Sequence, residues 1–360
     1  MNRADKRRFF ADDSFWNTPL GDSPEIEERS SFWQALLPLA EPPGGVYINM
    51  EKYTIPVYAV DDHTPRHDIG RSFVAGGRFG RYADSPIARV WNHRNPLGFG
   101  PGFGRAVPIP DDARPDPASD AHLALIDYEA GRVWDMWGAH RDEAGEWWTY
   151  SGNVYDLYGS GLFDPADYPY PNGEKIHTWG PARAAGVPII AGLILKREVQ
   201  SGRIEHKVAA ACSMVGFLEY AYPPAISTDG RIPGGIPEGN VVQLDPKLDL
   251  DTLGLKPGAK VVARTLQEYG MVMTDGSDSL SIYAEAPWTP HCGGWEGLLA
   301  PNDLRAIPQD RFRFIKADSY IERGTAGNGY FSKTDRETWP LAVRRLQKWA
   351  AEGGAKSGND

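Results

Sequence analysis

Apolar and polar residues alternate with a period of two between residues 120 and 151, and this is the clearest pattern in the chain. Such alternation is typical of β-strands, because successive side chains point to opposite faces of a sheet. Turns at 128–131 and 142–145 separate the alternating segments. Pairing Asp127 with Arg132, and then Trp137 with Tyr150, predicts a three-stranded meander. One face of this meander would carry His122, Asp135, Trp137, Trp148 and Tyr150.

Short apolar runs broken by glycine and proline predict further strands along most of the chain. The expected strands lie at 53–60, 203–214, 241–244 and 311–317, with a hairpin between 271–275 and 280–285. Helical periodicity is limited to 23–37, 196–201, 257–269 and 338–351. Because strands and helices do not alternate, we expect a mainly β protein. It would be an antiparallel β-sandwich or jelly roll, decorated by helices at the N-terminus, near 257–269 and at the C-terminus.

The predicted helices and strands divide the chain into three parts. An N-terminal extension with a helix would span 1–40. The β-sandwich, expected to carry the catalytic residues, would span 41–320. A C-terminal helix and tail would span 321–360.

The charge of the chain narrows its range of partners. A formal net charge of −10 disfavours nucleic acid and anionic membrane surfaces as main partners, because both are bound through basic surfaces. The sequence has no 18-residue apolar stretch, and its charged first ten residues lack an apolar core. We therefore expect no transmembrane helix and no signal peptide here. A cytoplasmic location and export with removal of a signal peptide both stay open.

Motifs for bound cofactors are not found in the sequence. The glycine-rich loop at 98–104 has neither the dinucleotide spacing nor a following helix. His63 and His67 are separated by Pro65, which would break a helix that placed both imidazoles on one face. The sequence therefore predicts no cofactor and no metal ion at the site, and whether a structural metal ion is bound stays open.

The predicted meander face combines flat aromatic rings with a carboxylate and an imidazole. Sugar rings stack on aromatic side chains, and acid–base work on a glycosidic bond needs carboxylates or imidazoles. A sheet packed on both sides, with the same residues in its core, is the alternative. The catalytic candidates are Asp135, Glu205, His206 and His122, and the sugar-binding candidates are Trp137, Trp148, Tyr150 and Tyr283.

Five short segments carry a family resemblance over residues 45–320: Val107-Pro-Ile-Pro110, Asp120-Ala-His-Leu123, Arg183-Ala-Ala-Gly-Val-Pro-Ile-Ile-Ala-Gly192, Gly202-Arg-Ile-Glu-His206 and Tyr283-Ala-Glu285. Together they resemble a group of largely uncharacterised, often exported bacterial proteins of the actinobacterial type. The resemblance implies a β-rich fold and no specific activity. By analogy alone, that fold is similar to jelly-roll enzymes that degrade polysaccharides.

Three functions fit these observations, each with a carbohydrate as the partner. A glycoside hydrolase, the working prediction, needs two carboxylates, drawn from Asp135, Glu205, Glu238 and Glu285. A non-catalytic glycan-binding protein would use Trp137 and Trp148 as a platform. The acidic candidates and the negative charge favour the hydrolase. The sugar, the linkage, retention or inversion, and the oligomeric state stay open.

A polysaccharide lyase is the third function. It needs a base, a proton donor, and a cation that neutralises a uronate. The base would be His122 or His206, the donor Tyr150 or Tyr283, and the cation an arginine such as Arg89 or Arg203.

Overall fold

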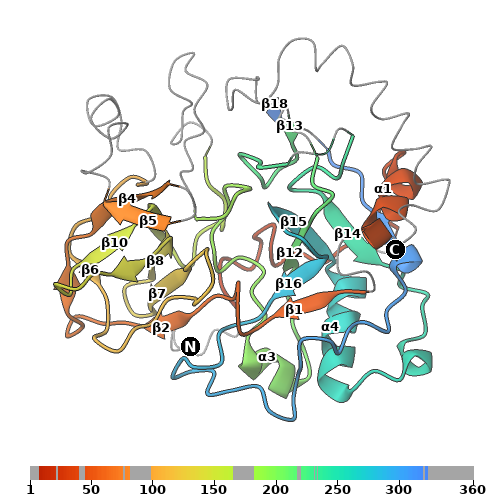
Figure 1. Cartoon of the computed structure of the whole chain (residues 1–360). Coiled ribbons are helices and arrows are strands. Elements are labelled where there is room, and N and C mark those ends of the chain that lie inside the picture. Colours follow the sequence, from red (N-terminus) through yellow and green to blue (C-terminus); the bar gives the residue numbers. More distant parts are fainter. Residues whose placement is uncertain are drawn as a thin grey trace, which may run out of the picture.

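The computed structural model describes residues 8–21, 23–39, 45–75, 78–81, 99–164, 182–216, 220–230, 232, 234–318 and 321–322. Strands predominate in this part of the chain (Figure 1). The α-helices are α1 (Ser30–Leu36), α3 (Lys196–Ser201) and α4 (Pro257–Glu268). Short 3₁₀ turns lie at Leu37–Leu39, Leu250–Leu253 and Gln309–Arg311. Among the described residues, no helix is both long and apolar enough to cross a membrane.

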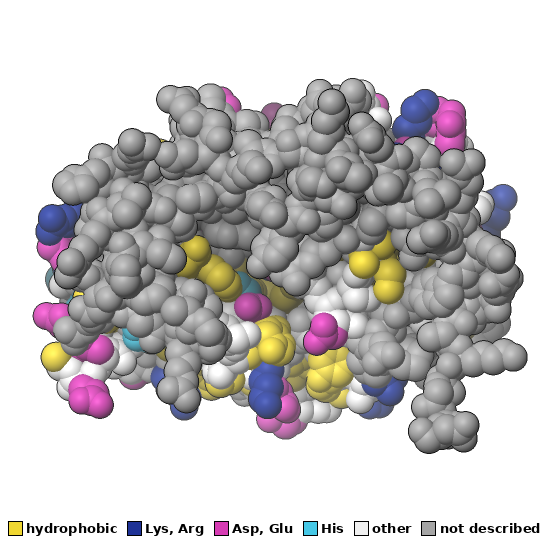
Figure 2. All heavy atoms as spheres, turned by 45° about the horizontal axis from the view of Figure 1, so that its top comes forward, with side chains coloured by type: hydrophobic (Ala, Val, Ile, Leu, Met, Phe, Trp, Pro, Cys, Tyr) yellow, Lys and Arg dark blue, Asp and Glu magenta, His cyan; other side chains and the backbone are white. Residues whose placement is uncertain are grey.

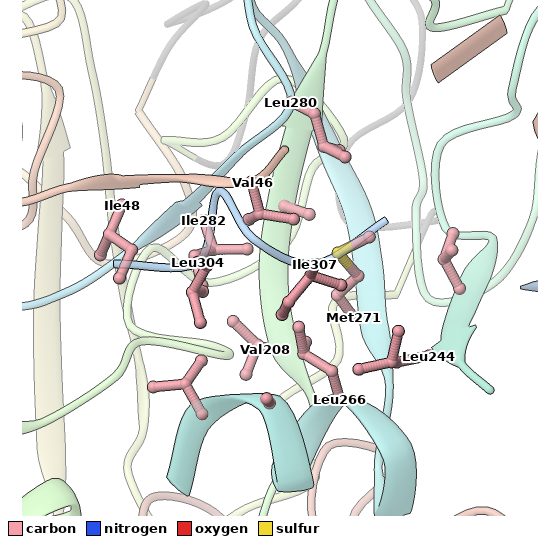
Figure 3. Close-up of a cluster of buried hydrophobic side chains, with 14 of the residues drawn as sticks. Val46, Ile48, Val208, Leu244, Leu266, Met271, Leu280, Ile282, Leu304 and Ile307 are labelled. Atoms are coloured by element: carbon pink, nitrogen blue, oxygen red, sulfur yellow. The ribbon is translucent and has the colours of Figure 1, made fainter. Parts of the chain in front are cut away.

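A six-stranded mixed sheet forms the larger half of the molecule. Its strands, in spatial order, are β1 (Tyr47–Asn49), β16 (Ser281–Tyr283), β12 (Val208–Cys212), β15 (Met271–Gly276), β14 (Val241–Leu244) and β17 (Phe312–Phe314). Apolar side chains from this sheet and from α4 form one buried core, part of which is shown in Figure 3. There Val208, Leu244 and Met271 of the sheet surround Leu266 of α4.

A four-stranded sheet, here called the β8 sheet, forms the other half. Its order is β11 (Ser151–Asp156), β8 (Arg132–Trp137), β7 (Leu123–Asp127) and β2 (Val57–Ala59). A second core joins one face of this sheet to the six-stranded sheet, with the apolar segment 182–195 between them. A third core covers its other face. Both faces of the β8 sheet are therefore buried.

Three smaller sheets complete the described structure. One contains β5 (Arg78–Arg81), β4 (Gly70–Ala75), β10 (Trp147–Thr149) and β9 (His140–Arg141). The others pair β3 (Arg66–His67) with β6 (Val107–Pro108), and β13 (Tyr220–Ala221) with β18 (Ile321–Glu322).

The prediction of a mainly β protein is confirmed, but the pairing is not purely antiparallel. Strands β12 and β15 run parallel, as do β1 and β16, β2 and β7, and β4 and β10. The predicted hairpin at 271–285 is also wrong, because β12 lies between β15 and β16 and pairs with both. The small residues of β12 (Val-Ala-Ala-Ala-Cys) allow it to be buried on both faces.

The helix expected at 257–269 is confirmed as α4, and the turn expected at 196–201 is α3. The helix expected at 23–37 begins only at Ser30. Its predicted first turn is instead extended, since Ile26 forms a β-bridge with Ile315 and Glu27 N–H donates to the Phe314 carbonyl. The helix expected at 338–351 lies outside the described residues.

Gly239 allows two chain segments to approach closely. Its φ is +85°, and a Cβ built there would lie 1.5 Å from the Tyr222 carbonyl oxygen. We expect Gly239→Ala to lower the free energy of unfolding by more than the roughly 1–2 kcal/mol that a left-handed backbone costs an alanine. Gly254→Ala is the matched control, because Gly254 has a φ of +64° and nothing within 4 Å of its Cβ position. Urea unfolding of both variants measures the difference, and equal losses would contradict the close approach.

Candidate functional site

Arg183 lies at the centre of a buried polar cluster between the two main sheets. The segment that carries it is fixed to both sheets. Ala185 N–H donates to the Thr274 carbonyl of β15, and Ile189 N–H donates to Asp135 Oδ2 of β8 at 3.0 Å. The guanidinium is 1% exposed, donates from Nη2 to the Ile189 carbonyl at 2.9 Å, and lies 4.2 Å from the Tyr283 ring centroid. Its Nε and Nη1 are buried without a hydrogen-bond partner among the described residues, so two strong donors are left unsatisfied there.

His122 contributes an imidazole to the same cluster, directly before β7. Burial lowers its pKa to about 4; Asp120 opposes this shift, and the charge of Arg183 adds to it. The ring is therefore neutral at neutral pH. Its Nδ1 is buried and has no hydrogen-bond partner in the part of the chain that the structure describes. A neutral imidazole with a free nitrogen can accept a proton.

Asp135 lies in the interior of the β8 sheet, opposite Asn153 of β11. It is 0% exposed, so the prediction that it lies on an open face is wrong. Burial raises its pKa to about 7, although the hydrogen bond from Ile189 and the charge of Arg183 act to lower it. Asp135 therefore holds the segment that carries Arg183 through the hydrogen bond from Ile189, and it does not face solvent.

Tyr283 of β16 lies under the Arg183 guanidinium. Burial raises its pKa well above the usual value, and the charge of Asp275 adds to the shift. The phenol therefore keeps its proton at neutral pH and can act as a proton donor. We name Asp120, His122, Asp135, Arg183 and Tyr283 the central polar site.

An aromatic pair borders the central polar site. The rings of Trp137 and Tyr150 meet edge to face with centroids 4.8 Å apart, and Trp137 Nε1 donates to Asp120 Oδ1 at 3.3 Å. All three side chains are half-buried. In the view of Figure 2, hydrophobic, histidine and acidic side chains gather near the middle of the molecule.

Three further carboxylates, here named the acidic triad, adjoin the central polar site. Asp275 is the second-last residue of β15, and Asp229 and Glu238 come from the segment between β13 and β14. One oxygen from each lies within 4.8 Å of the other two. Burial raises the pKa of Glu238 well above its usual value, and the charges of Asp229 and Asp275 add to this. The charges of Asp229 and Asp275 also act on Tyr283, so the triad is close to the central site.

The structure separates the remaining predicted residues from this site. The paired strands β8 and β11 place Ser151, not Tyr150, opposite Trp137. Strand β10, with Trp148, belongs to another sheet. Trp148 therefore borders a different cavity of about 700 Å³, lined also by Arg66, His67 and Arg105. The prediction of one open face with Trp137 and Trp148 together is wrong. The pairing of β8 differs by one residue from the predicted register, and β10 pairs with β4 and β9 in another sheet.

His206 and Glu205 occupy a third place, near α3. His206 is buried, its Nε2 is 3.2 Å from Glu198 Oε2, and its Nδ1 is 2.7 Å from the Lys207 carbonyl. Glu205 forms an ion pair with Arg203 at 3.0 Å. Both His206 and Asp135 are buried, and none of these partners is shared with Asp135, so the described contacts do not bring the two side chains together. Glu285 accepts from Lys196 N–H instead, and Arg89 lies outside the described residues.

The His206–Glu198 pair gives a stability prediction. Burial acts to lower the pKa of His206, but the charge and hydrogen bond of Glu198 outweigh it, so the pKa is raised. A raised folded-state pKa stabilises the fold fully below the unfolded value of about 6.5, and this contribution is lost as the pH rises through the folded-state pKa. We expect the free energy of unfolding to fall on the order of 1 kcal/mol across that window, the scale of a charge-assisted hydrogen bond. Denaturation of wild type and His206→Gln at pH 6 and pH 8 tests this, with exposed His63→Gln as control. An unchanged pH dependence in His206→Gln would contradict it.

Sequence reasoning missed Arg183, Asp120, Asp229 and Asp275. Arg183 begins the segment Arg183–Gly192, which carries part of the family resemblance but no predicted role for the arginine. One feature of the sequence could have indicated this site: an arginine at the start of an apolar run. If such an arginine is buried, its guanidinium needs hydrogen-bond acceptors. Comparisons with family models, curated proteins and solved structures give no match for this chain, so the site rests on its own geometry.

Proposed function

We propose that this protein is a carbohydrate-active enzyme that cleaves glycosidic bonds by elimination, next to a uronic acid. One observation carries the proposal. A buried arginine, two of whose donors have no partner among the described residues, lies over a phenol that keeps its proton and acts electrostatically on a neutral imidazole. These are the three groups that a polysaccharide lyase needs, whereas the carboxylates predicted for hydrolysis lie apart.

The roles follow from the chemistry of each side chain. Arg183 would pair with the uronate carboxylate, because a planar guanidinium can donate two parallel hydrogen bonds to the two carboxylate oxygens. Neutralising that charge acidifies the neighbouring C–H, and His122 Nδ1 would remove this proton. The electron pair left behind forms the new C=C bond and expels the glycosidic oxygen, which takes a proton from Tyr283. Proton exchange with water then restores His122 and Tyr283, so no other reactant is consumed.

The aromatic pair fits the same substrate. Trp137 and Tyr150 offer partly exposed rings beside Asp120, where the apolar face of a neighbouring sugar can stack. Asp120 can accept hydrogen bonds from sugar hydroxyls. The facing sheets support reading the fold as a β-sandwich, and a jelly-roll strand order stays a prediction.

Hydrolysis is the second candidate, favoured by the half-buried carboxylates Asp120 and Asp275 at the edge of the site. A hydrolase would use one protonated and one ionised carboxylate. The cavity beside Trp148 favours glycan binding without cleavage as a third outcome.

A panel of neutral and uronate-containing glycans separates these functions. We expect new reducing ends together with ultraviolet absorbance from an unsaturated uronate. Reducing ends without that absorbance would replace elimination by hydrolysis. Binding without cleavage across the panel would leave only the binding role, and neither binding nor cleavage would overturn the proposal.

A further inference from the structure

We propose that the acidic triad of Asp229, Glu238 and Asp275 is a binding site for a hard divalent cation, calcium foremost. The site is independent of the glycan reaction proposed above. Its evidence is the placement of three carboxylates, an unpartnered buried oxygen and an adjoining cavity.

The spacing of the carboxylates fits one shared ion. One oxygen from each residue lies within 4.8 Å of the other two. Oxygen ligands lie about 2.3–2.6 Å from calcium, so two ligands of one ion are at most about 5.2 Å apart. Magnesium, at about 2.0–2.1 Å, would require a span of at most about 4.2 Å. A spacing within 4.8 Å meets the calcium limit, and all three ligand atoms are oxygens, which such hard ions prefer.

Glu238 supplies the second, separate observation. Its side chain is 0% exposed. Oε2 accepts from Asp229 N–H at 3.2 Å, and the Thr228 side chain also acts on this carboxyl group and lowers its pKa. Oε1 is buried and meets no donor at hydrogen-bond distance among the described residues. A buried carboxylate oxygen almost always has a donor or an ion. Since Glu238 is directed at two other carboxylates, a cation is the partner that would satisfy Glu238 Oε1 and offset the repulsion among the three.

The surroundings allow an ion to enter. A cavity of about 310 Å³ borders Asp229 and is lined also by Ser213, Gly230 and Asp278. Gly276 leaves room for the Asp229 carboxylate, because a Cβ there would lie 2.9 Å from Asp229 Oδ2. Ser213 Oγ is buried without a hydrogen-bond partner in the described part of the chain, so the cavity wall also offers a neutral oxygen.

A cation bound to the acidic triad would make the electrostatic environment of the central polar site less negative. Asp275 and Asp229 of the triad act electrostatically on Tyr283, and Asp275 also interacts with Asp120 and Arg183. Two positive charges would offset most of the triad's negative charge. If the proposed elimination holds, the bound cation would lower the repulsion that an anionic sugar meets there.

Calcium binding to chelator-treated full-length protein tests the site directly. We expect a single calcium site by isothermal titration calorimetry, and a rise in Tm of roughly 5 °C or more when calcium exceeds its Kd about 100-fold. Magnesium and manganese are titrated in parallel and should bind more weakly. The absence of binding and of a Tm shift with all three ions would overturn the proposal.

Glu238→Gln keeps the shape of the side chain and removes its charge. We expect its calcium affinity to fall about 100-fold or more, because second-shell changes alone cost 10- to 100-fold. Glu285→Gln is the matched control, since Glu285 is also buried but accepts from Lys196 N–H outside the triad; it should bind as wild type does. If Glu238→Gln does not fold, the half-buried Asp275→Asn replaces it. Wild-type affinity in the folded triad variant would refute the site. Because binding is read without a glycan, calcium binding with no cleavage would reject only the proposed reaction.

Discussion

Substitution of His122 by glutamine is expected to lower turnover on a uronate-containing glycan by about 10²- to 10⁴-fold, the usual contribution of a general base. The reason is geometric: His122 Nδ1 is the free basic nitrogen of the central polar site. Glutamine keeps a polar side chain but cannot take up the proton. Initial rates of ultraviolet absorbance measure the loss, and circular dichroism checks that the variant is folded.

The dependence of activity on pH distinguishes a general base at His122 from a residue that only supports the fold. Burial holds the pKa of His122 at about 4, with Asp120 and the backbone of Thr54 acting against burial and Arg183 acting with it. Activity should therefore fall as the pH drops through about 4, and this acidic limb should be missing from the residual activity of His122→Gln. His63→Gln, at an exposed histidine, is the control. A variant with normal turnover, or with an unchanged acidic limb, would exclude His122 as the base.

Local pairing was predictable from the sequence wherever a short turn fixed it. The pairs Asp127–Arg132 and Ala124–Asp135 of β7 and β8 are confirmed. The separation of faces is confirmed as well, since Leu125, Trp134 and Met136 lie in one core, and Ala124 and Val133 in another. Period-two alternation determines which side chains share a face. It does not determine what covers that face.

The exposure of the β8 sheet depended on a distant segment. Residues 182–195 fill the space between the two main sheets and bury Asp135. In the sequence this segment is an apolar run with two glycines and a proline. Nothing in this pattern indicates which face of which sheet the segment covers. The burial of Asp135 was therefore not predictable from its own strand.

The one-residue register error between β8 and β11 has a local cause. Both Tyr150 N–H and Thr149 Oγ1 donate to the Trp137 carbonyl, so the chain turns at these residues and ladder pairing resumes at Ser151. A one-residue shift reverses every side chain, and it transfers Trp148 to another cavity. The order of strands in the six-stranded sheet also differs from the prediction. The insertion of β12 between β15 and β16 separates two strands that are neighbours in the sequence, and no short motif indicates it.

Replacement of Arg183 by lysine should reveal the substrate class. Lysine keeps a positive charge but loses the planar fork that can bind two carboxylate oxygens. We expect kcat/KM on a uronate glycan to fall about 10²- to 10³-fold, the cost of removing a preorganised charge-stabilising donor. Arg132→Lys, at an exposed arginine at the start of β8, is the matched control and should retain wild-type activity.

A carboxyl-reduced form of the same glycan distinguishes substrate recognition from a structural role of Arg183. Wild type should bind the uronate form more tightly than the reduced, neutral form, because Nε and Nη1 of Arg183 are donors with no partner among the described residues. In Arg183→Lys this preference should shrink, while the affinity for the neutral form stays nearly unchanged. Equal weakening for both glycans, with a lower Tm, would mean that Arg183 supports the fold through Ile189 and Tyr283 and does not recognise a carboxylate. The ratio of the two affinities, measured for both proteins at one ionic strength, decides between these roles, because screening by salt changes every charged contact.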